Sequence, residues 1–575
     1  MNHSTLLATA ARLLMVSAAG LLAACQLPSV RETAPAAVSN RTPGVAAANP
    51  YAVEAGLEVL RAGGSAADAA VAVQAMLGLV EPQSSGVGGG AFLLHYEAAT
   101  GKVTAFDGRE AAPAGATPDM FLQADGKPMP WRDGVVGGRS TGVPGAMVML
   151  GAVQQRFGKR PWSTLFEPAI RAAEGGITTP GRLARFVNGD WPQARLEDAT
   201  ALFARPDGQR LQAGDPYVNA AYGSTLRQLA SKGPRALLEP PISTHIIERT
   251  HADPLPGTLA QSDFDAYQPR VGEPVCGPYR VYVVCVPPPP SSGAALLQLL
   301  AILDRTDIAG RGPDDPQAWF LFAEASRLMY ADRNEYFGDP AFVDVPLAGL
   351  LDPAYVAVRA ALIGEVAGPP PAAGRPAGIE RGRDATHEPA GTSHFVVIDA
   401  AGNVVSMTTS VESLFGSGRA VDGFFLNNQL TDFSFQPVEN GKPVANAVAG
   451  GKRPRSSMSP VIVLDRQGRL VAALGSPGGS AILAYNAKAL VGLLAWGLPM
   501  QQAIDLPNLI AAGSAYFGEA PKFAPGVLAA LAARGVEVKS GRGEESGLHG
   551  FAVRPDGTLD GAADPRREGE WKTLQ

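Results

Sequence analysis

The stretch of sequence that decides the fold runs from residue 391 to residue 410 and reads GTSHFVVIDAAGNVVSMTTS. Its halves SHFVVID and NVVSMTTS are rich in β-branched residues and flank Ala400-Ala401-Gly402, which predicts two antiparallel strands joined by a turn. The preceding residues, 366–391, read VAGPPPAAGRPAGIERGRDATHEPAG and show no periodicity, which is typical of an exposed loop. A loop therefore runs straight into a strand that begins with a threonine, Thr392.

Further elements on both sides of this strand pair indicate a mixed architecture. Ser65 and Asp68 fit a capping box before the run AADAAVAVQAMLGLV, which predicts the start of a helix. The apolar spacing predicts helices over 51–60, 65–79, 144–156, 163–174, 217–230, 292–304, 315–331 and 480–496. Alternation predicts further strands over 91–98, 102–108, 459–465 and 469–475. Helices and strands mixed in this way indicate α+β or α/β layers.

The composition indicates a large globular protein. Its 575 residues fit about four ordinary domains or fewer large ones, and a hydrophobic content of 46% excludes a disordered chain. Glycine (67) and proline (49) together make about 20% of the residues, against an average near 12%, so we expect many tight turns and long loops. The net charge is −6, so the composition does not indicate the basic patch that nucleic-acid binding requires.

The first residues have the pattern of an export signal. An apolar run from Leu13 to Ala24 follows Arg12 and is too short to span a bilayer, which predicts a signal peptide over residues 1–24. No other apolar stretch reaches the length of a membrane helix. We therefore expect an exported protein that has no membrane-spanning helix.

The end of this run resembles a bacterial lipobox. It reads LAAC over residues 22–25, and the resemblance implies cleavage before Cys25 and lipidation of its thiol. An ordinary secretory signal with a chance cysteine is the alternative. Gln26 follows the cysteine and implies the outer membrane, so the expected location is the periplasmic face, with a lipid anchor as the only membrane contact. Residues 25–48 are polar and proline-rich, which predicts a flexible tether.

The two remaining cysteines, Cys276 and Cys285, lie nine residues apart in VCGPYRVYVVCVPPPP. An exported protein permits disulfides, so a bridge across a hairpin is one interpretation. Two small apolar residues in neighbouring strands are the other. The sequence leaves the two interpretations open.

The sequence lacks the motifs of several common catalytic and cofactor-binding sites. Seven histidines occur, and none stands in HExxH or in a cluster with cysteine, which argues against a zinc site. Residues 86–91 match GxGxxA, but a predicted strand follows them. A dinucleotide-binding motif is followed by a helix, so this match does not indicate a dinucleotide site. Neither a Walker A motif nor a GxSxG elbow occurs. No metal or organic cofactor is implied.

The surroundings of Thr392 form an ordered set of motifs. They read GSAADAAVAVQAMLGLVEPQSSGVGGGAFLLHY (64–96), DGREAAPA (107–114), PPPPSSG (287–293), GTSHFVVIDAAGNVVSMTTSVESLFGSG (391–418), LNNQLTDFSF (426–435), KRPRSSMSP (452–460), GSPGGS (475–480) and GAADPRR (561–567). In this order, and across nearly the whole mature chain, they closely resemble the γ-glutamyltransferase (γ-glutamyl transpeptidase) family.

The resemblance implies the N-terminal-nucleophile hydrolase fold, a four-layer αββα sandwich of the α+β class. It also implies a precursor that cuts itself between Gly391 and Thr392, in GTSHF where the family reads TTHY. The expected products are a large subunit over residues 49–391 and a small subunit over residues 392–575, which form one domain as a heterodimer.

The chemistry of threonine fits this position. A hydroxyl is a weak nucleophile that needs an adjacent base. Once Thr392 becomes a chain terminus, its α-amine, with a reference pKa near 7.7–8.0, can act as that base. Before the cut the same hydroxyl can attack the carbonyl of Gly391, which has no Cβ to hinder the approach. Cleavage would therefore create the catalyst.

The resemblance also implies the residues that recognise the substrate. Arg109 matches the arginine that pairs with the α-carboxylate of the γ-glutamyl group, and a guanidinium suits a carboxylate bidentately. Ser456 and Ser457 match serines that bind the same carboxylate. Asp432 matches the acid that holds the substrate ammonium, and Gln429 matches a neighbour in that role.

The remaining predicted site residues lie near the reacting carbonyl, and one further residue differs from the family pattern. Gly478 and Gly479 match the oxyanion hole, where backbone N–H groups stabilise developing negative charge. Ser410 stands where the family commonly has a threonine hydroxyl beside the nucleophile. Glu412 stands where many members have an asparagine that contacts the substrate amine. A carboxylate there suits an ammonium and penalises acyl groups that lack one, such as glutaryl.

These observations predict a self-processing γ-glutamyltransferase and glutathione hydrolase. Its expected partners are glutathione and other γ-glutamyl compounds as donors, with water, amino acids or peptides as acceptors. An acylase of the same fold, acting for example on cephalosporin side chains, is the close alternative. A processed but inactive lipoprotein that binds γ-glutamyl ligands is the rival from another class.

Overall fold

The computed structural model describes residues 41–376, 379–386, 388–389, 391–541 and 546–574. The predicted signal peptide, the lipidation site Cys25 and the tether as far as residue 40 lie outside these residues and stay predictions. Within the described ranges, no helix is long and apolar enough to cross a membrane.

The strand pair around residue 400 lies at the centre of a seven-stranded antiparallel sheet. Its first strand, β9 (Gly391–Ile398), pairs with β10 (Val404–Glu412), which confirms the predicted hairpin. The strand order is β21 (Glu570–Thr573), β1 (Gly44–Ala47), β9, β10, β2 (Gly90–Glu97), β3 (Lys102–Gly108) and β6 (Arg270–Gly272).

A second, six-stranded sheet packs against the first. Its order is β20 (Leu559–Ala563), β19 (His549–Val553), β16 (Leu470–Gly475), β15 (Val461–Leu464), β8 (Tyr282–Val286) and β7 (Val275–Tyr279). Cys276 and Cys285 face each other across β7 and β8 and form a disulfide with a Cα–Cα distance of 4.1 Å. Of the two interpretations left open by the sequence, the structure supports the bridge.

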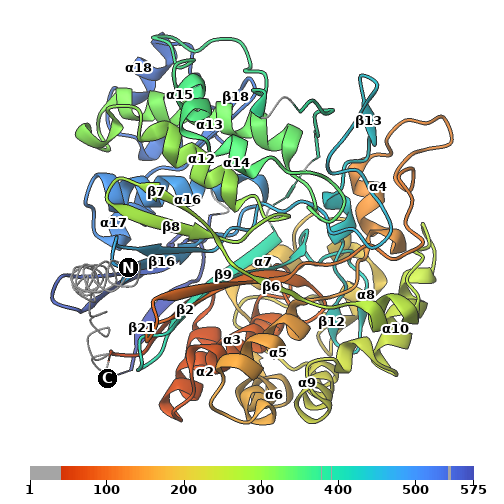
Figure 1. The fold of residues 1–575 in the computed structure, drawn as a ribbon. Helices are drawn as coiled ribbons and strands as arrows, with labels where there is room; N and C mark the ends of the chain where they lie inside the picture. Colours follow the sequence, from red (N-terminus) through yellow and green to blue (C-terminus); the bar gives the residue numbers. More distant parts are fainter. Residues whose placement is uncertain (1–40, 377–378, 387, 390, 542–545, 575) are drawn as a thin grey trace, which may run out of the picture. The chain divides into compact units, whose positions relative to one another are not determined.

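Three apolar cores separate four layers (Figure 1). Side chains such as Val396, Ile398, Ile462 and Phe551 fill the space between the two sheets. On the outer face of the first sheet lie α2 (Pro50–Arg61), α3 (Ala66–Val80), α5 (Ala146–Phe157) and α6 (Glu167–Gly175). On the outer face of the second lie α12 (Gly293–Leu303), α13 (Pro316–Tyr336), α16 (Ile482–Leu490) and α17 (Met500–Asp505). The predicted αββα sandwich is confirmed.

Local sequence explains why the central helix begins where it does. The Ser65 side chain accepts a hydrogen bond from the Asp68 backbone N–H, and the Asp68 carboxylate accepts one from Ser65, which confirms the capping box. All fifteen residues of α3 are buried, because this helix lies between the first sheet and its helical neighbours. A run of small apolar residues suits a helix that is covered all round.

Two predicted segments differ from the structure. The tether, predicted over 25–48, ends earlier, because Gly44–Ala47 forms the buried strand β1 between β9 and β21. Its four small apolar residues carry no alternation, so only their neighbours in the sheet reveal a strand. The helix predicted over 163–174 is a 3₁₀ turn (Trp162–Phe166) followed by α6, since Pro168 suits the first turn of a new helix.

Further helices and two-stranded pairs surround these four layers. The helices are α4 (Trp131–Val136), α7 (Gly181–Val187), α8 (Glu197–Leu202), α9 (Ala220–Lys232), α10 (Ile242–His251), α11 (Gln261–Ala266), α14 (Leu347–Leu350), α15 (Pro353–Ala360) and α18 (Val527–Ala533). The two-stranded pairs are β4 (Ile177–Thr178) with β5 (Pro216–Tyr217), β11 (Ala420–Val421) with β12 (Phe424–Phe425), β13 (Val438–Glu439) with β14 (Lys442–Pro443), and β17 (Leu509–Ala512) with β18 (Ala515–Gly518).

Candidate active site

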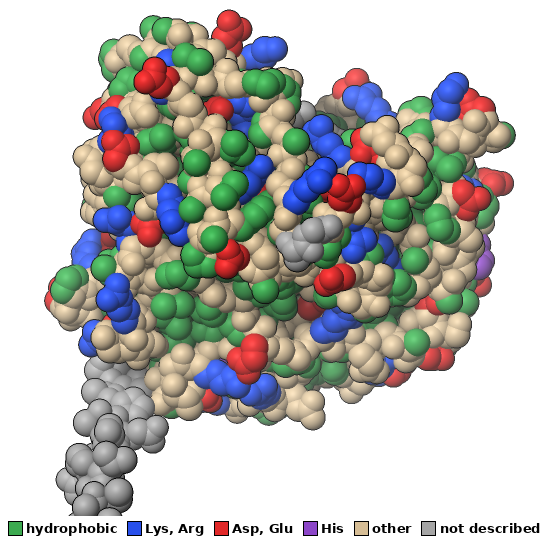
Figure 2. Space-filling model, turned by 45° about the horizontal axis from the view of Figure 1, so that its top comes forward, with side chains coloured by type: hydrophobic (Ala, Val, Ile, Leu, Met, Phe, Trp, Pro, Cys, Tyr) green, Lys and Arg blue, Asp and Glu red, His purple; other side chains and the backbone are tan. Residues whose placement is uncertain are grey.

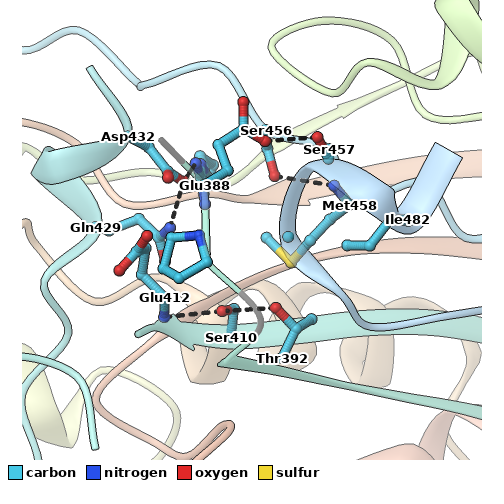
Figure 3. A pocket seen from close by; sticks show the side chains of 13 residues that line it. Glu388, Thr392, Ser410, Glu412, Gln429, Asp432, Ser456, Ser457, Met458 and Ile482 are labelled. Atoms are coloured by element: carbon cyan, nitrogen blue, oxygen red, sulfur yellow. Dashed lines mark hydrogen bonds and ion pairs between the residues drawn. The ribbon is translucent and has the colours of Figure 1, made fainter. Parts of the chain in front are cut away.

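Strand register brings Thr392 and Ser410 together. They are partners across β9 and β10, so their side chains point to the same face of the sheet. Their hydroxyl oxygens lie 3.1 Å apart, and Figure 3 shows both at the floor of a pocket. Thr392 is only 4% exposed. Two residues eighteen positions apart in sequence thus form one hydroxyl pair.

The hydrogen bonds around Ser410 fix the direction of this pair. Its hydroxyl donates to the carbonyl oxygen of Gly391 at 2.7 Å and accepts from the Glu412 backbone N–H at 2.8 Å. A serine hydroxyl has one proton to donate and can accept twice. Because that proton goes to Gly391, the hydroxyl of Thr392 donates to Ser410. The carbonyl before Thr392 is therefore polarised by the Ser410 hydroxyl, which in turn accepts a hydrogen bond from the Thr392 hydroxyl.

An irregularity of β10 shapes the pocket next to this pair. A bulge between Ser410 and Glu412 puts Glu412 opposite Gly391, and Glu412 has a φ of 81°, which is costly for a residue with a side chain. A Cβ on Gly391 would lie 2.3 Å from the Glu412 carbonyl oxygen. The residue before Thr392 must therefore be glycine because the neighbouring backbone passes so close.

Arg109 and Asp432 form the charged side of the pocket. Arg109 is fully buried, and its Nη2 donates to Asp432 at 2.5 Å and to the Arg455 carbonyl at 2.8 Å. Gln429 donates to the same Asp432 oxygen at 2.7 Å. The Nη1 of Arg109 has no hydrogen-bond partner within the described part of the chain. The two residues predicted to hold a substrate's carboxylate and ammonium thus pair with each other.

Glu412 adds a second carboxylate beside Asp432. One of its oxygens accepts from the Asn428 side chain, while Oε1 is buried and has no hydrogen-bond partner among the described residues. Burial and the neighbouring Asp432 raise the pKa of Glu412 well above its usual value. Burial also raises the pKa of Asp432, against the effect of Arg109. We call Glu412 and Asp432 the carboxylate pair; a proton or a ligand cation relieves its repulsion.

The serines and glycines predicted for the site lie on its opposite side. Ser457 donates to Glu388 at 2.5 Å, and Ser456 accepts from the Met458 backbone N–H at 3.1 Å. Gly478 and Gly479 form a turn with φ of 134° and 55°, values that favour glycine. Figure 3 shows Ser456 and Ser457 across the pocket from Ser410.

Nine of the ten predicted catalytic and substrate-binding residues line one pocket, and the tenth, Gly478, adjoins Gly479 in the same turn. Their individual roles stay predictions. The cavity they enclose measures about 20 Å³, which is room for about one water molecule. Glu388 and Pro389, from the loop before Thr392, line the same cavity. Within the described residues, no group of three or more His, Cys, Asp or Glu side chains is arranged to hold a metal ion.

A family model described as Gamma-glutamyltranspeptidase matches residues 52–574. The chain belongs to the γ-glutamyltranspeptidase family. This match covers all the site residues described above and confirms the resemblance that the motifs indicate.

Relatives of this γ-glutamyltranspeptidase family member carry more than one kind of name. The chain is 35% identical over 540 residues to a glutathione hydrolase proenzyme of Bacillus subtilis strain 168, covering 91% of this chain and 90% of that protein. It is 35% identical over 530 residues to an acylase ACY 1 proenzyme of Pseudomonas sp. strain V22, covering 91% of each. The crystal structure of a cephalosporin acylase from Bacillus halodurans matches with a TM-score of 0.82 at 26% identity, covering 94% of this chain and 97% of that one.

Sequence reasoning missed several members of this γ-glutamyltranspeptidase site. Glu388 lies within the loop before Thr392, and Arg333 and Arg455 hold its carboxylate. Arg567 donates to the Thr392 carbonyl at 2.8 Å. Arg455 and Arg567 stand inside the motifs KRPRSSMSP and GAADPRR, so charged residues within those motifs were an available signal. Arg333, in the last turn of α13, carries no such signal.

Proposed function

We propose that the chain is a self-cleaving γ-glutamyltransferase that also hydrolyses glutathione, with Thr392 as its nucleophile. The observation that carries this proposal is the hydrogen-bond relay from Thr392 through Ser410 to the Gly391 carbonyl, in a pocket lined by Arg109 and Asp432. The printed names of the relatives, which include proenzymes, support a precursor that is processed.

The first reaction is cleavage of the chain. The Thr392 hydroxyl oxygen attacks the carbonyl carbon of Gly391, and the new C–O bond replaces the C–N bond of that peptide. The hydroxyl proton passes by way of Ser410 to the released nitrogen of Thr392. Water then hydrolyses the ester, which leaves a carboxylate on Gly391 and returns the hydroxyl to Thr392. Polarisation of the carbonyl by Ser410 favours the attack.

The second reaction uses the new terminus. The α-amine of Thr392 takes the proton of its own hydroxyl, which attacks the γ-carbonyl of the donor, and the amine passes the proton to the leaving amine. Backbone N–H groups at Gly478 and Gly479 would stabilise the developing oxyanion. Water then releases glutamate from the γ-glutamyl ester, or an amino acid or peptide amine accepts the γ-glutamyl group.

Charge complementarity supports a donor that carries both an ammonium and a carboxylate. In the structure Arg109 and Asp432 neutralise each other. A zwitterionic head group can replace this pairing, its carboxylate on Arg109 and its ammonium on the carboxylate pair, so that no buried charge is left without a partner. The γ-glutamyl group has such a head.

The acylase names among the relatives make a second donor class the main competitor. Glu412 argues against it. A γ-glutamyl ammonium can take the place of the proton that relieves the repulsion between Glu412 and Asp432, whereas a glutaryl group, which has no ammonium, makes no charged contact with them. A hydrogen bond to a charged group contributes about 1.5–3 kcal/mol. The carboxylate pair therefore favours γ-glutamyl over glutaryl donors.

A denaturing gel tests the nucleophile. Wild type should give two bands, of about 38 kDa for residues 25–391 and about 19 kDa for residues 392–575 if mass follows length, whereas Thr392→Ala should stay a single uncut chain, because it lacks the attacking hydroxyl. The matched control is Thr408→Ala, a neighbour on β10 whose hydroxyl contacts His394 and not the pocket. It should be cut like wild type. A wild type that remains one band under all conditions rejects the proposal.

A pair of chromogenic substrates tests the donor class. The cut enzyme should release p-nitroaniline from γ-glutamyl-p-nitroanilide at least about tenfold faster, as kcat/KM, than from glutaryl-p-nitroanilide, which corresponds to the lower end of the contribution of a hydrogen bond to a charged group. A preference for the glutaryl compound would make the chain an acylase. No turnover of either by a cut chain would leave only the ligand-binding rival.

A further inference from the structure

The loop before Thr392 carries a buried acid, Glu388, that is only 8% exposed. Its carboxylate accepts from Nη2 of Arg333 at 2.7 and 3.0 Å, from Nη2 of Arg455 at 3.1 Å and from the Ser457 hydroxyl at 2.5 Å. Figure 3 shows Glu388 extending toward Ser457 in the pocket. This loop is therefore held at a side chain only four residues before the scissile bond.

Glu388 supplies one of two buried carboxylates that balance two buried arginines. Arg455 also pairs with Asp384 at 3.1 Å, so two buried arginines face two buried carboxylates. Burial alone would raise the pKa of Glu388, but Arg333 and Arg455 outweigh that effect and lower it. The carboxylate is thus ionised at neutral pH, and a buried ion pair of this kind is costly to break from one side.

The backbone next to Glu388 is held as well. Its carbonyl oxygen accepts from the Ser480 N–H at 3.3 Å, and a Cβ on Gly479 would lie 2.3 Å from the carbonyl oxygens of Glu388 and Pro389. The loop therefore crosses the glycine turn in close contact. On the other side of the scissile bond, Arg567 holds the Thr392 carbonyl.

We propose that Glu388 is a positioning residue for the self-cleavage, anchoring the loop so that the Gly391 carbonyl stays against the hydroxyls of Thr392 and Ser410. This inference rests on the proposed function above. Attack requires the reacting atoms to be held within about 3–3.5 Å, and a misplacement of about 1 Å can cost on the order of 100-fold in rate. The carboxylate does not touch the reacting atoms and acts through the chain that it holds.

The same anchor is temporary. Glu388 fills the place beside Ser457, and the remaining cavity of about 20 Å³ has no room for a γ-glutamyl group. After the cut, Glu388 belongs to a free chain end, and its departure removes one of the two carboxylates that pair with Arg333 and Arg455. Earlier residues of the same loop, such as Pro370 and Arg383, line a larger cavity of about 380 Å³. Figure 2 shows a notch at the top of the molecule, with Lys, Arg, Asp and Glu side chains along its edges.

A time course of cleavage tests the anchor. Full-length precursor is made by cell-free translation, synthesis is stopped, and the uncut fraction is followed on denaturing gels. We expect Glu388→Gln to slow cleavage by roughly 10- to 100-fold, because the amide leaves the two arginines with one carboxylate. Glu388→Asp keeps the charge on a shorter side chain and should recover at least threefold over Glu388→Gln. A merely space-filling role would instead favour the isosteric glutamine over aspartate.

The matched control is Glu380→Gln, which makes the same change in the same loop. Glu380 has a side chain 42% exposed and pairs with Arg375 and Lys442 at the surface, so cleavage should keep its wild-type rate. Cleavage of Glu388→Gln within twofold of wild type, or aspartate slower than glutamine, overturns the inference while leaving the proposed function intact. A wild type that is never cut overturns both.

Discussion

The central hairpin of β9 and β10 has two very different ends. At the turn, the Asp399 carboxylate accepts four hydrogen bonds, from the N–H groups of Ala66, Ala401 and Asn403 and from the Asn403 side chain. At the open end, the bulged Glu412 has a positive φ and a carboxylate oxygen with no hydrogen-bond partner among the described residues. At the turn, both oxygens of the Asp399 carboxylate accept hydrogen bonds. At the open end, one oxygen of the Glu412 carboxylate accepts none from the described residues.

Within this one hairpin, the turn at Asp399 therefore contributes to stability, and the open end at Glu412 contributes to the pocket. A satisfied buried carboxylate fixes the turn and the start of α3, and nothing there is left for a ligand to contact. The open end keeps backbone strain and a carboxylate oxygen without a hydrogen bond from the described residues, and other parts of the fold must hold both in place. Substitutions at the two ends should therefore affect different quantities, and three of them test that expectation.

The largest effect is expected at Ser410. Ser410→Ala removes the hydroxyl that donates a hydrogen bond to the Gly391 carbonyl, so cleavage of the chain should slow by about 100-fold or more. Gel time courses measure this, and thermal unfolding of the uncut chain should change little. Ser406→Ala, on the same strand with a hydroxyl bonded to Leu474, is the control and should be cut normally. Normal cleavage of Ser410→Ala would contradict the relay.

The next effect is expected at the turn and on stability alone. Asp399→Ala leaves four donors without their acceptor and should lower the free energy of unfolding by about 1–3 kcal/mol. The kcat of the cut enzyme should stay within twofold of wild type, because Asp399 lies at the far end of both strands. Urea unfolding and steady-state rates measure the two quantities. A large loss of kcat with unchanged stability would erase the distinction between the ends.

The smallest effect is expected at Glu412 and depends on pH. Because burial and Asp432 raise the pKa of Glu412, the carboxylate pair holds a proton that the donor's ammonium must displace. The KM for γ-glutamyl-p-nitroanilide should therefore fall as pH rises, until the donor's own ammonium loses its proton. Glu412→Gln should flatten this dependence and raise KM by about tenfold at pH 8, the loss of one charge-assisted contact. An unchanged pH profile would show that Glu412 does not face the donor.

Most of the fold and nearly all of the pocket follow from the sequence. The alternation in SHFVVID and NVVSMTTS predicts the hairpin, and its register then brings Thr392 opposite Ser410. The missed parts share one cause. Arg333 lies in a helix of the outer layer, and β1 consists of four small residues, so neither carries a local pattern. Their places depend on contacts with residues far away in the chain.

The sequence by itself determined the family and the layers and predicted a hydroxyl nucleophile with a glycine before it, because these depend on local patterns and on ordered motifs. Only the tertiary structure decided that Arg109 and Asp432 neutralise each other, that Cys276 and Cys285 are bridged, and that Glu388 occupies the pocket. The physical reason is that a charge buried in the pocket must find its partner in space. Spacing along the chain does not say which of the buried acids and arginines will meet.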